Sequence, residues 1–211
     1  MSACSLRILP LETGYLDEAV TIHLAGFPDF FLSFLGRDFL IEFYSAFLDD
    51  PVGIGFVACD PSGSVLGVIV GCQDPSGFFG RLVRRRWWAF CMASLSAIVK
   101  RPSCFPRLFR AFFYRGSFPA GPPRSLLSSI VVAPHAQSGG VGKMLIQAWL
   151  KELQLRGSTG AYLITDANEN EAVISFYLKN SWEFESSHYT KEGRLMQTYV
   201  LNFPTQALEE L

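Results

Sequence analysis

The sequence predicts an α/β (or α+β) fold, in which a β-sheet is flanked by helices. Strand-like and helix-like segments alternate through the C-terminal part of the chain, from about residue 126 to residue 203. Before them, two apolar strand-like segments, 53–60 and 64–74, are separated by Pro-Ser-Gly, which indicates a β-hairpin. Apolar residues at helical spacing precede this hairpin over 14–48. Composition agrees with the class, because 49% of the 211 residues are hydrophobic, enough for a large core.

The remaining elements follow from the same patterns. The chain is expected to begin with a strand over 6–12 and helices within 14–36 and over 37–48. After an interruption at 75–125, the expected elements are a strand at 126–132, a helix at 141–156, a strand at 160–165, a helix at 169–181 and strands at 182–189 and 194–203. No internal repeat, low-complexity tract or linker divides the chain. We therefore expect a single domain over 1–211 that contains a basic, aromatic helical insertion at 75–125.

The insertion has a helix-like part, 81–100, then a proline break and a second basic, aromatic part, 105–115. Its apolar segment 87–99 is shorter than the roughly 20 residues that cross a bilayer. Two interpretations stay open. The insertion is a helical pair packed on the main domain with its arginines in solvent, or it contacts a membrane surface through 81–115 as an interfacial amphipathic helix.

Charge is unevenly distributed along the chain. The formal net charge is −1, yet no Asp or Glu lies between Asp74 and Glu152, an interval that holds twelve of the 18 basic residues. Such a segment attracts phosphates, anionic lipid or nucleic acid, but no nucleic-acid recognition module matches, so nucleic acid is not expected. The five cysteines lack CxxC spacing and the N-terminus lacks a secretory signal. We therefore expect reduced thiols, no metal site and a cytoplasmic location.

The most informative stretch is SSIVVAPHAQSGGVGKMLIQAWL, residues 128–150, a strand followed by a glycine-rich turn and a helix. A helix N-terminus leaves backbone N–H groups unpaired, and glycines let them approach an anion closely, so this joint predicts a phosphate site to which Lys143 adds positive charge. The letters do not fit a P-loop, because Met144 follows Gly142-Lys143. They do not fit a dinucleotide fingerprint either, because Leu145 replaces its last glycine.

Two motifs in order do match a known family. Gln137-x-x-Gly140-x-Gly142 after Val-Val-Ala-Pro resembles the acetyl-CoA-binding motif of the Gcn5-related N-acetyltransferase (GNAT) superfamily. Downstream, Asn170 precedes Tyr177 by two helical turns, and Lys-Asn-Ser-Trp follows, which is similar to the family's second motif. The resemblance is close over about 126–202.

The resemblance implies a fold, an activity and a set of site residues. The fold is a mixed, mostly antiparallel sheet flanked by helices, with the helical insertion between the third and fourth strands. The activity is direct transfer of the acetyl group of acetyl-CoA to an amine of a small-molecule or sugar-type acceptor. Tyr177 takes the catalytic position of an acid that protonates the leaving thiolate. The implied acetyl-CoA-binding residues are Ile130, Val131 and Val132 beside the pantetheine arm, Gln137, Ser138, Gly139, Gly140, Val141, Gly142 and Lys143 around the pyrophosphate, and Asn170.

A general base cannot be assigned from the sequence. Thr165 stands where some family members carry glutamate, and the adjacent Asp166 should point to the opposite face of its strand. The other candidates are a water held by Ser128 and Ser129, the three histidines His23, His135 and His188, and Asp29. The missing carboxylate keeps a non-catalytic acyl-CoA-binding or regulatory protein open as the alternative function.

The family's glycine is replaced at two further positions, Ser138 and Ser181. We expect cofactor binding to survive, and Asn180 to close the helix in a left-handed conformation. The acceptor, the choice between N- and O-acetylation, and the oligomeric state, a homodimer among the options, are not determined by the sequence.

Overall fold

The computed structural model describes residues 6–28, 30–100, 123–191 and 193–204. They form a 7-stranded sheet in the order β1-β2-β3-β4-β5-β7-β6. Every neighbouring pair is antiparallel except β4 and β5, which are parallel, so the predicted mixed, mostly antiparallel sheet is confirmed. The strands are β1 (Arg7–Pro10), β2 (Gly53–Cys59), β3 (Val65–Cys72), β4 (Ser125–Val132), β5 (Gly160–Asp166), β6 (Glu183–Tyr189) and β7 (Leu195–Asn202).

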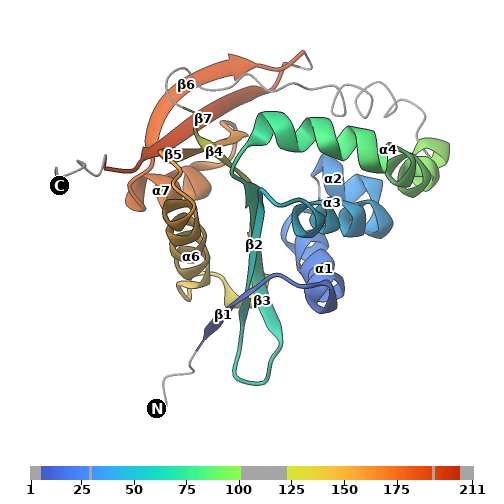
Figure 1. Cartoon of the computed structure of the whole chain (residues 1–211), viewed down its shortest axis with the longest axis horizontal. Helices are drawn as coiled ribbons and strands as arrows, with labels where there is room; N and C mark the ends of the chain where they lie inside the picture. The colour runs from blue at the N-terminus through green and yellow to red at the C-terminus, as the bar shows by residue number, and fades with distance from the viewer. Residues whose placement is uncertain (1–5, 29, 101–122, 192, 205–211) are drawn as a thin grey trace, which may run out of the picture.

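Helices cover both faces of this sheet (Figure 1). One face carries α1 (Leu16–Gly26), α2 (Phe31–Leu35) and α3 (Arg37–Asp49), and the other carries α6 (Val141–Leu155) and α7 (Glu171–Lys179). The long helix α4 (Pro75–Lys100) lies between β3 and β4 in the chain, as predicted for the insertion. Short 3-10 turns occur at Thr13–Tyr15 and Pro134–Ala136. The predicted second part of the insertion, 105–115, and Asp29 lie outside the described residues.

The sheet divides the core into two clusters, because successive side chains of a strand point to opposite faces. On β3, Val68 packs in the cluster with α1 and α3, whereas Ile69 packs in the cluster with α6. Gly71 lets the large Trp149 of α6 approach β3, since a Cβ at Gly71 would lie 2.4 Å from the Trp149 ring. Tight packing of α6 on the sheet fixes the position of its N-terminus, where the glycine-rich turn ends.

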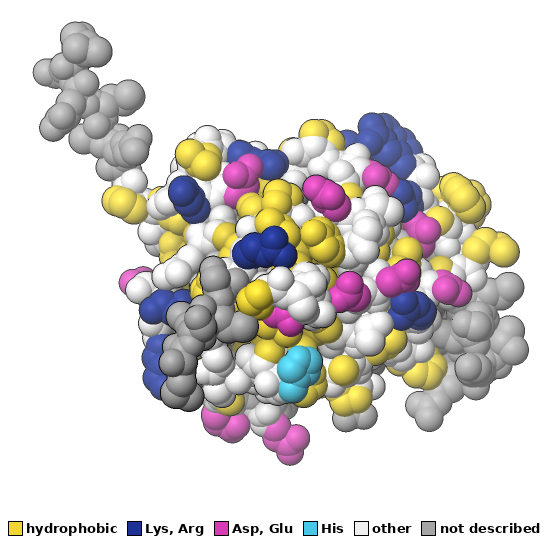
Figure 2. All heavy atoms as spheres, turned by 90° about the horizontal axis from the view of Figure 1, so that it is seen from below, with side chains coloured by type: hydrophobic (Ala, Val, Ile, Leu, Met, Phe, Trp, Pro, Cys, Tyr) yellow, Lys and Arg dark blue, Asp and Glu magenta, His cyan; other side chains and the backbone are white. Residues whose placement is uncertain are grey.

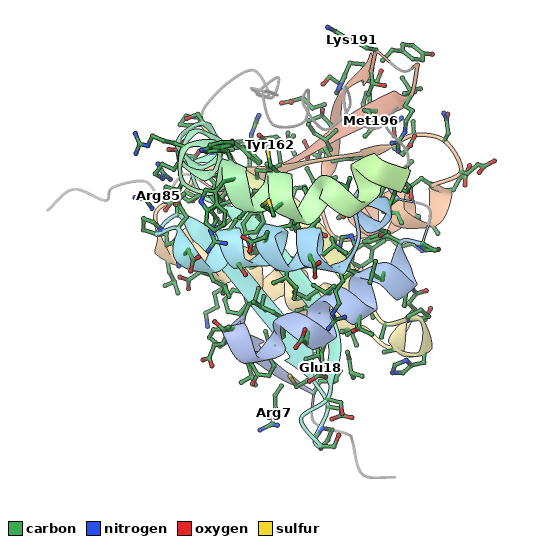
Figure 3. The ribbon with its side chains drawn as sticks, turned by 90° about the vertical axis from the view of Figure 1, so that its right-hand side faces the viewer. Arg7, Glu18, Arg85, Tyr162, Lys191 and Met196 are labelled. Atoms are coloured by element: carbon green, nitrogen blue, oxygen red, sulfur yellow. The ribbon has the colours of Figure 1, made fainter. Side chains whose placement is uncertain are left out.

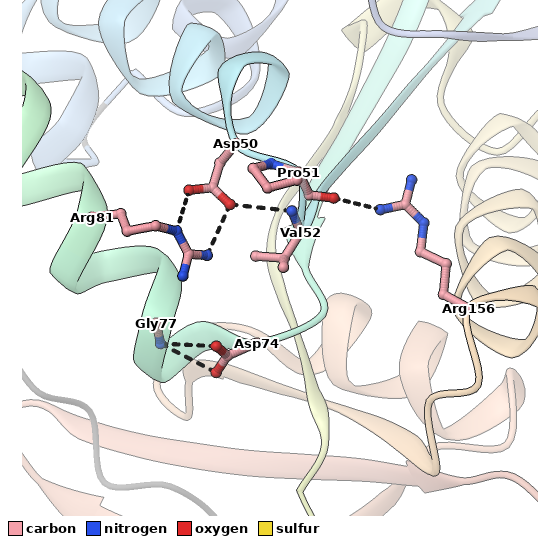
Figure 4. A network of polar contacts seen from close by, with 7 residues as sticks. All are labelled: Asp50, Pro51, Val52, Asp74, Gly77, Arg81 and Arg156. Atoms are coloured by element: carbon pink, nitrogen blue, oxygen red, sulfur yellow. Dashed lines mark hydrogen bonds and ion pairs between the residues drawn. The ribbon is translucent and has the colours of Figure 1, made fainter.

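Helix α4 begins at Pro75, six residues before the predicted start. The carboxylate of Asp74 accepts hydrogen bonds from the Gly77 N–H at 3.2 Å (Figure 4). It also accepts one from the Ser76 hydroxyl at 2.7 Å, and together these bonds cap the first turn. Proline is favoured in that first turn, because its missing N–H would have no helical partner there. The glycines at 77 and 80 concealed this start in the sequence pattern.

Helix α4, the first part of the predicted insertion, packs on α2 and α3. Phe90 is buried against Phe39, with ring centroids 5.0 Å apart. The carboxylate of Asp50 accepts two hydrogen bonds from Arg81, at 2.7 and 2.9 Å (Figure 4). Arg86 donates to Glu42 at 2.5 Å and also pairs with Asp49. The expectation that these arginines lie in solvent is therefore wrong for Arg81 and Arg86.

Acids from other segments pair with several basic residues of this interval that the structure describes. Arg124, for example, donates to Glu185 at 2.9 Å. On the face shown in Figure 2, basic and acidic side chains are interspersed. Among the described cysteines, Cys59 and Cys72 are buried and free and Cys91 is exposed and free. Within the part of the chain that the structure describes, no helix has the length and apolar character to cross a membrane.

Candidate active site

The parallel strands β4 and β5 pair only at their beginnings. The pairing joins Ser125 to Ala161 and Leu126 to Tyr162, and it stops there. Beyond this point β5 keeps its partner β7 as far as Asp166. The rest of β4 remains paired with β3 alone, so on its β5 side the backbone from Leu127 onward faces no strand among the described residues. Backbone N–H and C=O groups along such an edge are available to an extended ligand.

A β-bulge accompanies the separation of the two strands. Val70 of β3 pairs with Ser129, but the next residue, Gly71, pairs with Leu127, so Ser128 is an extra residue on β4. A bulge bends its strand and increases the local twist, and bulges occur often beside active sites. Ser128 therefore sits where β4 turns away from β5. The bulge also sets the side-chain alternation that follows, which places Ile130 and Val132 against the α6 cluster and Val131 against the α1 and α3 cluster.

The glycine-rich turn connects the open end of β4 to α6. Its residues Gln137, Ser138, Gly139 and Gly140 are all exposed. Gly140 has φ of 82°, a left-handed conformation that favours glycine, and it directly precedes α6. Ser138 also has a positive φ, 63°, so the serine that replaces the family's glycine is held in a conformation that costs about 1 kcal/mol. The side-chain amide of Gln137 donates back to the Val132 carbonyl at 3.4 Å.

The N-terminus of α6 presents backbone donors beside this turn. The first helical bond runs from the Met144 N–H to the Gly140 carbonyl at 3.1 Å. The N–H groups of Val141, Gly142 and Lys143 precede that bond and lie at the positive end of the helix dipole. Lys143 is exposed in the same turn. No acid occurs in the first turn of α6, so the chemistry of this donor set fits a pyrophosphate.

Gly142 is the position where the turn is most closely packed. A Cβ there would lie 3.3 Å from the ring of Phe176 on α7 and 3.7 Å from a methyl group of Val132. The closeness of these three residues shows that β4, α6 and α7 converge at the turn. A larger side chain at Gly142 would therefore be crowded against Phe176 and Val132.

Asn170 links the end of β5 to the start of α7. Its side-chain nitrogen donates to the Thr165 hydroxyl and to the Asp166 carbonyl, both at 2.8 Å. Both amide hydrogens are thereby used within the chain, and only the side-chain oxygen is left for a ligand. Thr165, at the position of the family's glutamate, is an acceptor in this network. The structure thus gives Asn170 a positioning role that its motif did not predict.

Asp166 is not placed to act as a general base. Arg194 donates to its carboxylate at 2.9 Å from Nε and forms an ion pair with it. Partial burial raises the pKa of Asp166, but hydrogen bonds from Arg194 and from the Asn168 N–H outweigh burial, so that the pKa is lowered overall. The carboxylate is held ionised by these structural partners, one of which, Arg194, directly precedes β7.

Tyr177 lies in the interior of the structure, between Phe176 and Trp182. Its side chain is 6% exposed, and burial raises the pKa of its phenol above the ordinary value of 10. The phenol is therefore protonated at neutral pH and able to donate a proton. The same burial also suits a packing role, since Tyr177 belongs to the α6 core cluster.

The end of α7 differs from the prediction. Ser181, and not Asn180, has the positive φ of 65°, whereas Asn180 has φ of −104°. The Trp182 N–H donates to the Tyr177 carbonyl and the Ser181 N–H donates to the Leu178 carbonyl, each at 3.2 Å. This pattern is a Schellman motif, which requires the left-handed residue one position later than we expected.

The three histidines lie in different surroundings. His135 is exposed and His188 is half-buried, whereas His23 of α1 is 1% exposed. The Nδ1 atom of His23 lies 2.8 Å from the Tyr44 hydroxyl of α3. Tyr44 is fully buried. Sequence analysis missed Tyr44, because its helical spacing marks it only as a core residue.

Comparison with protein-family models gives one match, to the model described as the acetyltransferase (GNAT) family, over residues 21–182. The chain belongs to the acetyltransferase (GNAT) family. No curated protein sequence matches it. Acetyl-CoA is the acyl donor of this N-acetyltransferase.

Three solved structures illustrate the similarity in fold. The ribosomal-protein-S18-alanine N-acetyltransferase from Escherichia coli has a TM-score of 0.62 at 16% identity, with 98% of this chain and 99% of that chain covered. Ard1 from Thermoplasma volcanium has a TM-score of 0.60 at 12% identity, with 94% and 98% covered. A Bacillus anthracis structure described as a streptothricin acetyltransferase, in complex with acetyl coenzyme A, has a TM-score of 0.59 at 15% identity, with 94% and 100% covered.

Proposed function

We propose that this GNAT enzyme transfers the acetyl group to an amine of a small-molecule or sugar-type acceptor, with acetyl-CoA held between the separated ends of β4 and β5. The observation that carries the proposal is the open edge of β4 leading directly into the donor-rich N-terminus of α6. Ile130, Val131 and Val132 would lie beside the pantetheine arm through their backbone. The pyrophosphate would be held by the turn and first helical residues, which are Gln137, Ser138, Gly139, Gly140, Val141, Gly142 and Lys143.

The residues of the open edge supply the chemistry. A backbone N–H of β4 near Ile130 would donate to the thioester carbonyl, and this bond strengthens as negative charge develops on the oxygen. The phenol of Tyr177 would donate its proton to the leaving sulfur, since burial keeps it protonated. Asn170 would hold the end of β5 against α7 and offer its side-chain oxygen to the pantetheine amide.

Helix α4 supports a small or phosphate-bearing acceptor. It covers α2 and α3 on the sheet face opposite α6, and it contains no acid from Pro75 to Lys100. Arg81 and Arg86 are committed to carboxylates, whereas Arg84 and Arg85 are exposed. Among the described side chains of α4, these two arginines are the exposed basic groups that a phosphate on the acceptor would meet. Reversing both charges should raise the acceptor KM and leave the affinity for acetyl-CoA unchanged.

Release of free CoA tests the proposal against the alternative, a non-catalytic acyl-CoA-binding protein. Wild-type protein would be incubated with acetyl-CoA and, in turn, glucosamine, phosphoethanolamine, spermidine and a peptide with a free N-terminal alanine. Amine-dependent release of the CoA thiol, with the acetylated amine found by mass spectrometry, supports the enzyme. Tight binding of acetyl-CoA without release for any amine, across the full concentration range, would favour the binding protein.

A peripheral, membrane-associated form of the enzyme is favoured by one further observation. The outer side of α4 exposes Trp87, Trp88 and Met92, at 58%, 60% and 65%, next to Arg84 and Arg85. Arg85 lies at the outer edge of the molecule in Figure 3. Interfacial helices combine tryptophan with basic residues in this manner. Co-sedimentation with phosphatidylglycerol vesicles, lost in a Trp87→Ser/Trp88→Ser variant, would support this form. Equal recovery of both proteins in the supernatant would refute it.

A further inference from the structure

The end of α1 lies against the open part of β4. Gly26 is the last residue of α1, and a Cβ added to it would lie 2.5 Å from a methyl group of Val131 and 3.8 Å from the Val132 carbonyl oxygen. Both valines belong to the part of β4 that does not pair with β5. Val131 also packs in the cluster with α1 and α3. The chain that leaves α1 therefore starts beside the open edge, on the sheet face opposite α6.

Two aromatic rings follow at this corner. Phe27 comes directly after Gly26 and packs on the α1 and α3 cluster, and its ring centroid lies 5.8 Å from that of Phe30. The Phe30 N–H donates to the Phe27 carbonyl at 3.2 Å, so a hydrogen-bonded turn holds the two residues together. Phe30 is 42% exposed, although phenylalanine is among the residues most often buried. Its ring is supported from one side by Phe27 and leaves surface for contact with a ligand.

A second apolar pair lies across the opening, on β5 and β7. Leu163 of β5 packs in the α6 cluster, so the next residue, Ile164, points to the opposite face. Met196 of β7 pairs with Asp166, two residues beyond Ile164 on β5, and residues directly opposite each other share a face. Met196 lies near the hairpin between β6 and β7 in Figure 3. Ile164 and Met196 are half-buried, and neither belongs to a core cluster of the described residues.

The acid on this face of β5 is already paired. The carboxylate of Asp166 accepts a hydrogen bond from Arg194 at 2.9 Å and forms an ion pair with it, which compensates its charge. His188 of β6 pairs with Met196 and adds a polar group to the same face. An apolar group of an acceptor would lose little hydration against Phe30, Ile164 and Met196, whereas several charged amines would lose hydration there at a cost.

We propose that Phe30 and Met196 select an acceptor amine that carries an aromatic ring on a short alkyl chain, as 2-phenylethylamine does. The inference rests on the proposed acetyl transfer and names the class of small molecule that accepts the acetyl group. An amine that reaches the gap between β4 and β5 from the α1 side passes between the two apolar pairs. Its ring would contact Phe30 edge to face, with the Met196 sulfur at the ring edge. Both residues act by binding, and the products are the N-acetylated amine and CoA thiol.

The test measures release of CoA thiol with 2-phenylethylamine, glucosamine and spermidine at saturating acetyl-CoA. Wild type should have a kcat/KM for 2-phenylethylamine that exceeds the other two on the order of tenfold. Phe30→Ala should raise the KM for 2-phenylethylamine about 3- to 10-fold and keep kcat within about twofold, because it removes a binding contact alone. Met196→Gln should raise the same KM about threefold or more, whereas Met196→Leu should stay near wild type, because leucine keeps the site apolar.

Phe184→Ala is the matched control. Phe184 is 53% exposed on β6, and its ring contacts Tyr199 of the α6 cluster, on the other face of the sheet, so this variant should keep the wild-type KM. Calorimetry should give one acetyl-CoA affinity for all five proteins, and melting curves show which are folded.

Two results would overturn the selection of an arylalkylamine. One is a wild type that prefers glucosamine or spermidine to 2-phenylethylamine, which leaves acetyl transfer itself standing. The other is a KM that stays within about twofold of wild type in both Phe30→Ala and Met196→Gln. Should one of these variants fail to fold, the other decides. A wild type that releases CoA with no amine refutes the proposed function, and this inference with it.

Discussion

Burial of a neutral histidine makes the stability of this protein depend on pH in a defined window. Burial lowers the pKa of His23 from 6.5 to about 4, and its ring packs against the rings of Phe27 and Tyr44. The unfolded chain therefore binds a proton near pH 6.5 that the folded chain does not bind until about pH 4. Since the unfolded state holds more protons in this window, stability rises with pH and is lost as pH falls.

The size of the effect follows from the difference between the two pKa values. Each pKa unit corresponds to about 1.4 kcal/mol, so the full loss between pH 6.5 and about 4 is roughly 3 kcal/mol, and about 2 kcal/mol of it is lost by pH 5. Urea unfolding at several pH values between about 7.5 and 4.5 measures it directly. Asp50, Asp74 and Asp166, whose pKa values are lowered below 3.8, lose their contributions only at lower pH and do not overlap with this window.

His23→Asn is the decisive variant. Asparagine places an amide near the position of Nδ1, so a polar contact with Tyr44 is retained while the titrating group is removed. Its unfolding free energy should be nearly independent of pH in the window, although its absolute stability is lower. His135→Asn, at an exposed position, should keep the wild-type dependence. A wild type whose stability is flat from pH 7.5 to 5, or a His23→Asn variant with an undiminished slope, would refute the assignment of a buried neutral imidazole.

Three further outcomes are expected. Ser181→Gly should raise the free energy of unfolding by about 0.5–1 kcal/mol and the Tm by roughly 2–3 °C, because glycine adopts the left-handed conformation without strain; an unchanged or lower Tm contradicts the Schellman assignment. Asp50→Asn should destabilise the fold by about 1–3 kcal/mol, because it leaves the guanidinium of Arg81 without its carboxylate between α3 and α4; denaturant unfolding measures this, and a loss below about 0.5 kcal/mol would show that the pair does not hold α4 in place. Tyr177→Phe should lower kcat by about 10- to 10²-fold with an unchanged calorimetric affinity for acetyl-CoA; a normal kcat would assign Tyr177 to packing alone.

Local patterns were sufficient to predict most elements of the fold. The alternating apolar segments gave β2 and β3 and the helical spacing gave α3 and α6 to within a few residues. The prediction was less accurate at helix ends, where hydrogen bonds outside the apolar pattern decide where the helix begins or stops. Asp74 caps α4 and moves its start to Pro75. The Schellman hydrogen bonds, and not the preference of asparagine, select the left-handed residue after α7.

The candidate site also has one part that the sequence could predict and one part that it could not. The residues of the turn from Gln137 to Lys143 are contiguous, so a motif could identify them together. The separation of β4 from β5 could not be predicted from the sequence. It occurs at the bulge of β4, and only the strand register shows that Ser128 is the residue without a partner on β3. The contact of His23 with Tyr44 joins α1 and α3, and each residue alone has an ordinary helical position.

The measurement that tests the central claim most directly is calorimetric titration with acetyl-CoA of wild type, Gly142→Glu and the matched control Gln147→Glu. Glutamate at Gly142 would place a carboxylate beside the amides at the start of α6, next to Phe176 and Val132. Gln147 is exposed further along α6, so the same charge there changes the helix without entering the turn. Melting curves of the three proteins show whether each is folded. The account predicts binding by wild type and Gln147→Glu and none by folded Gly142→Glu. Equal binding by all three would place the cofactor elsewhere and contradict the account.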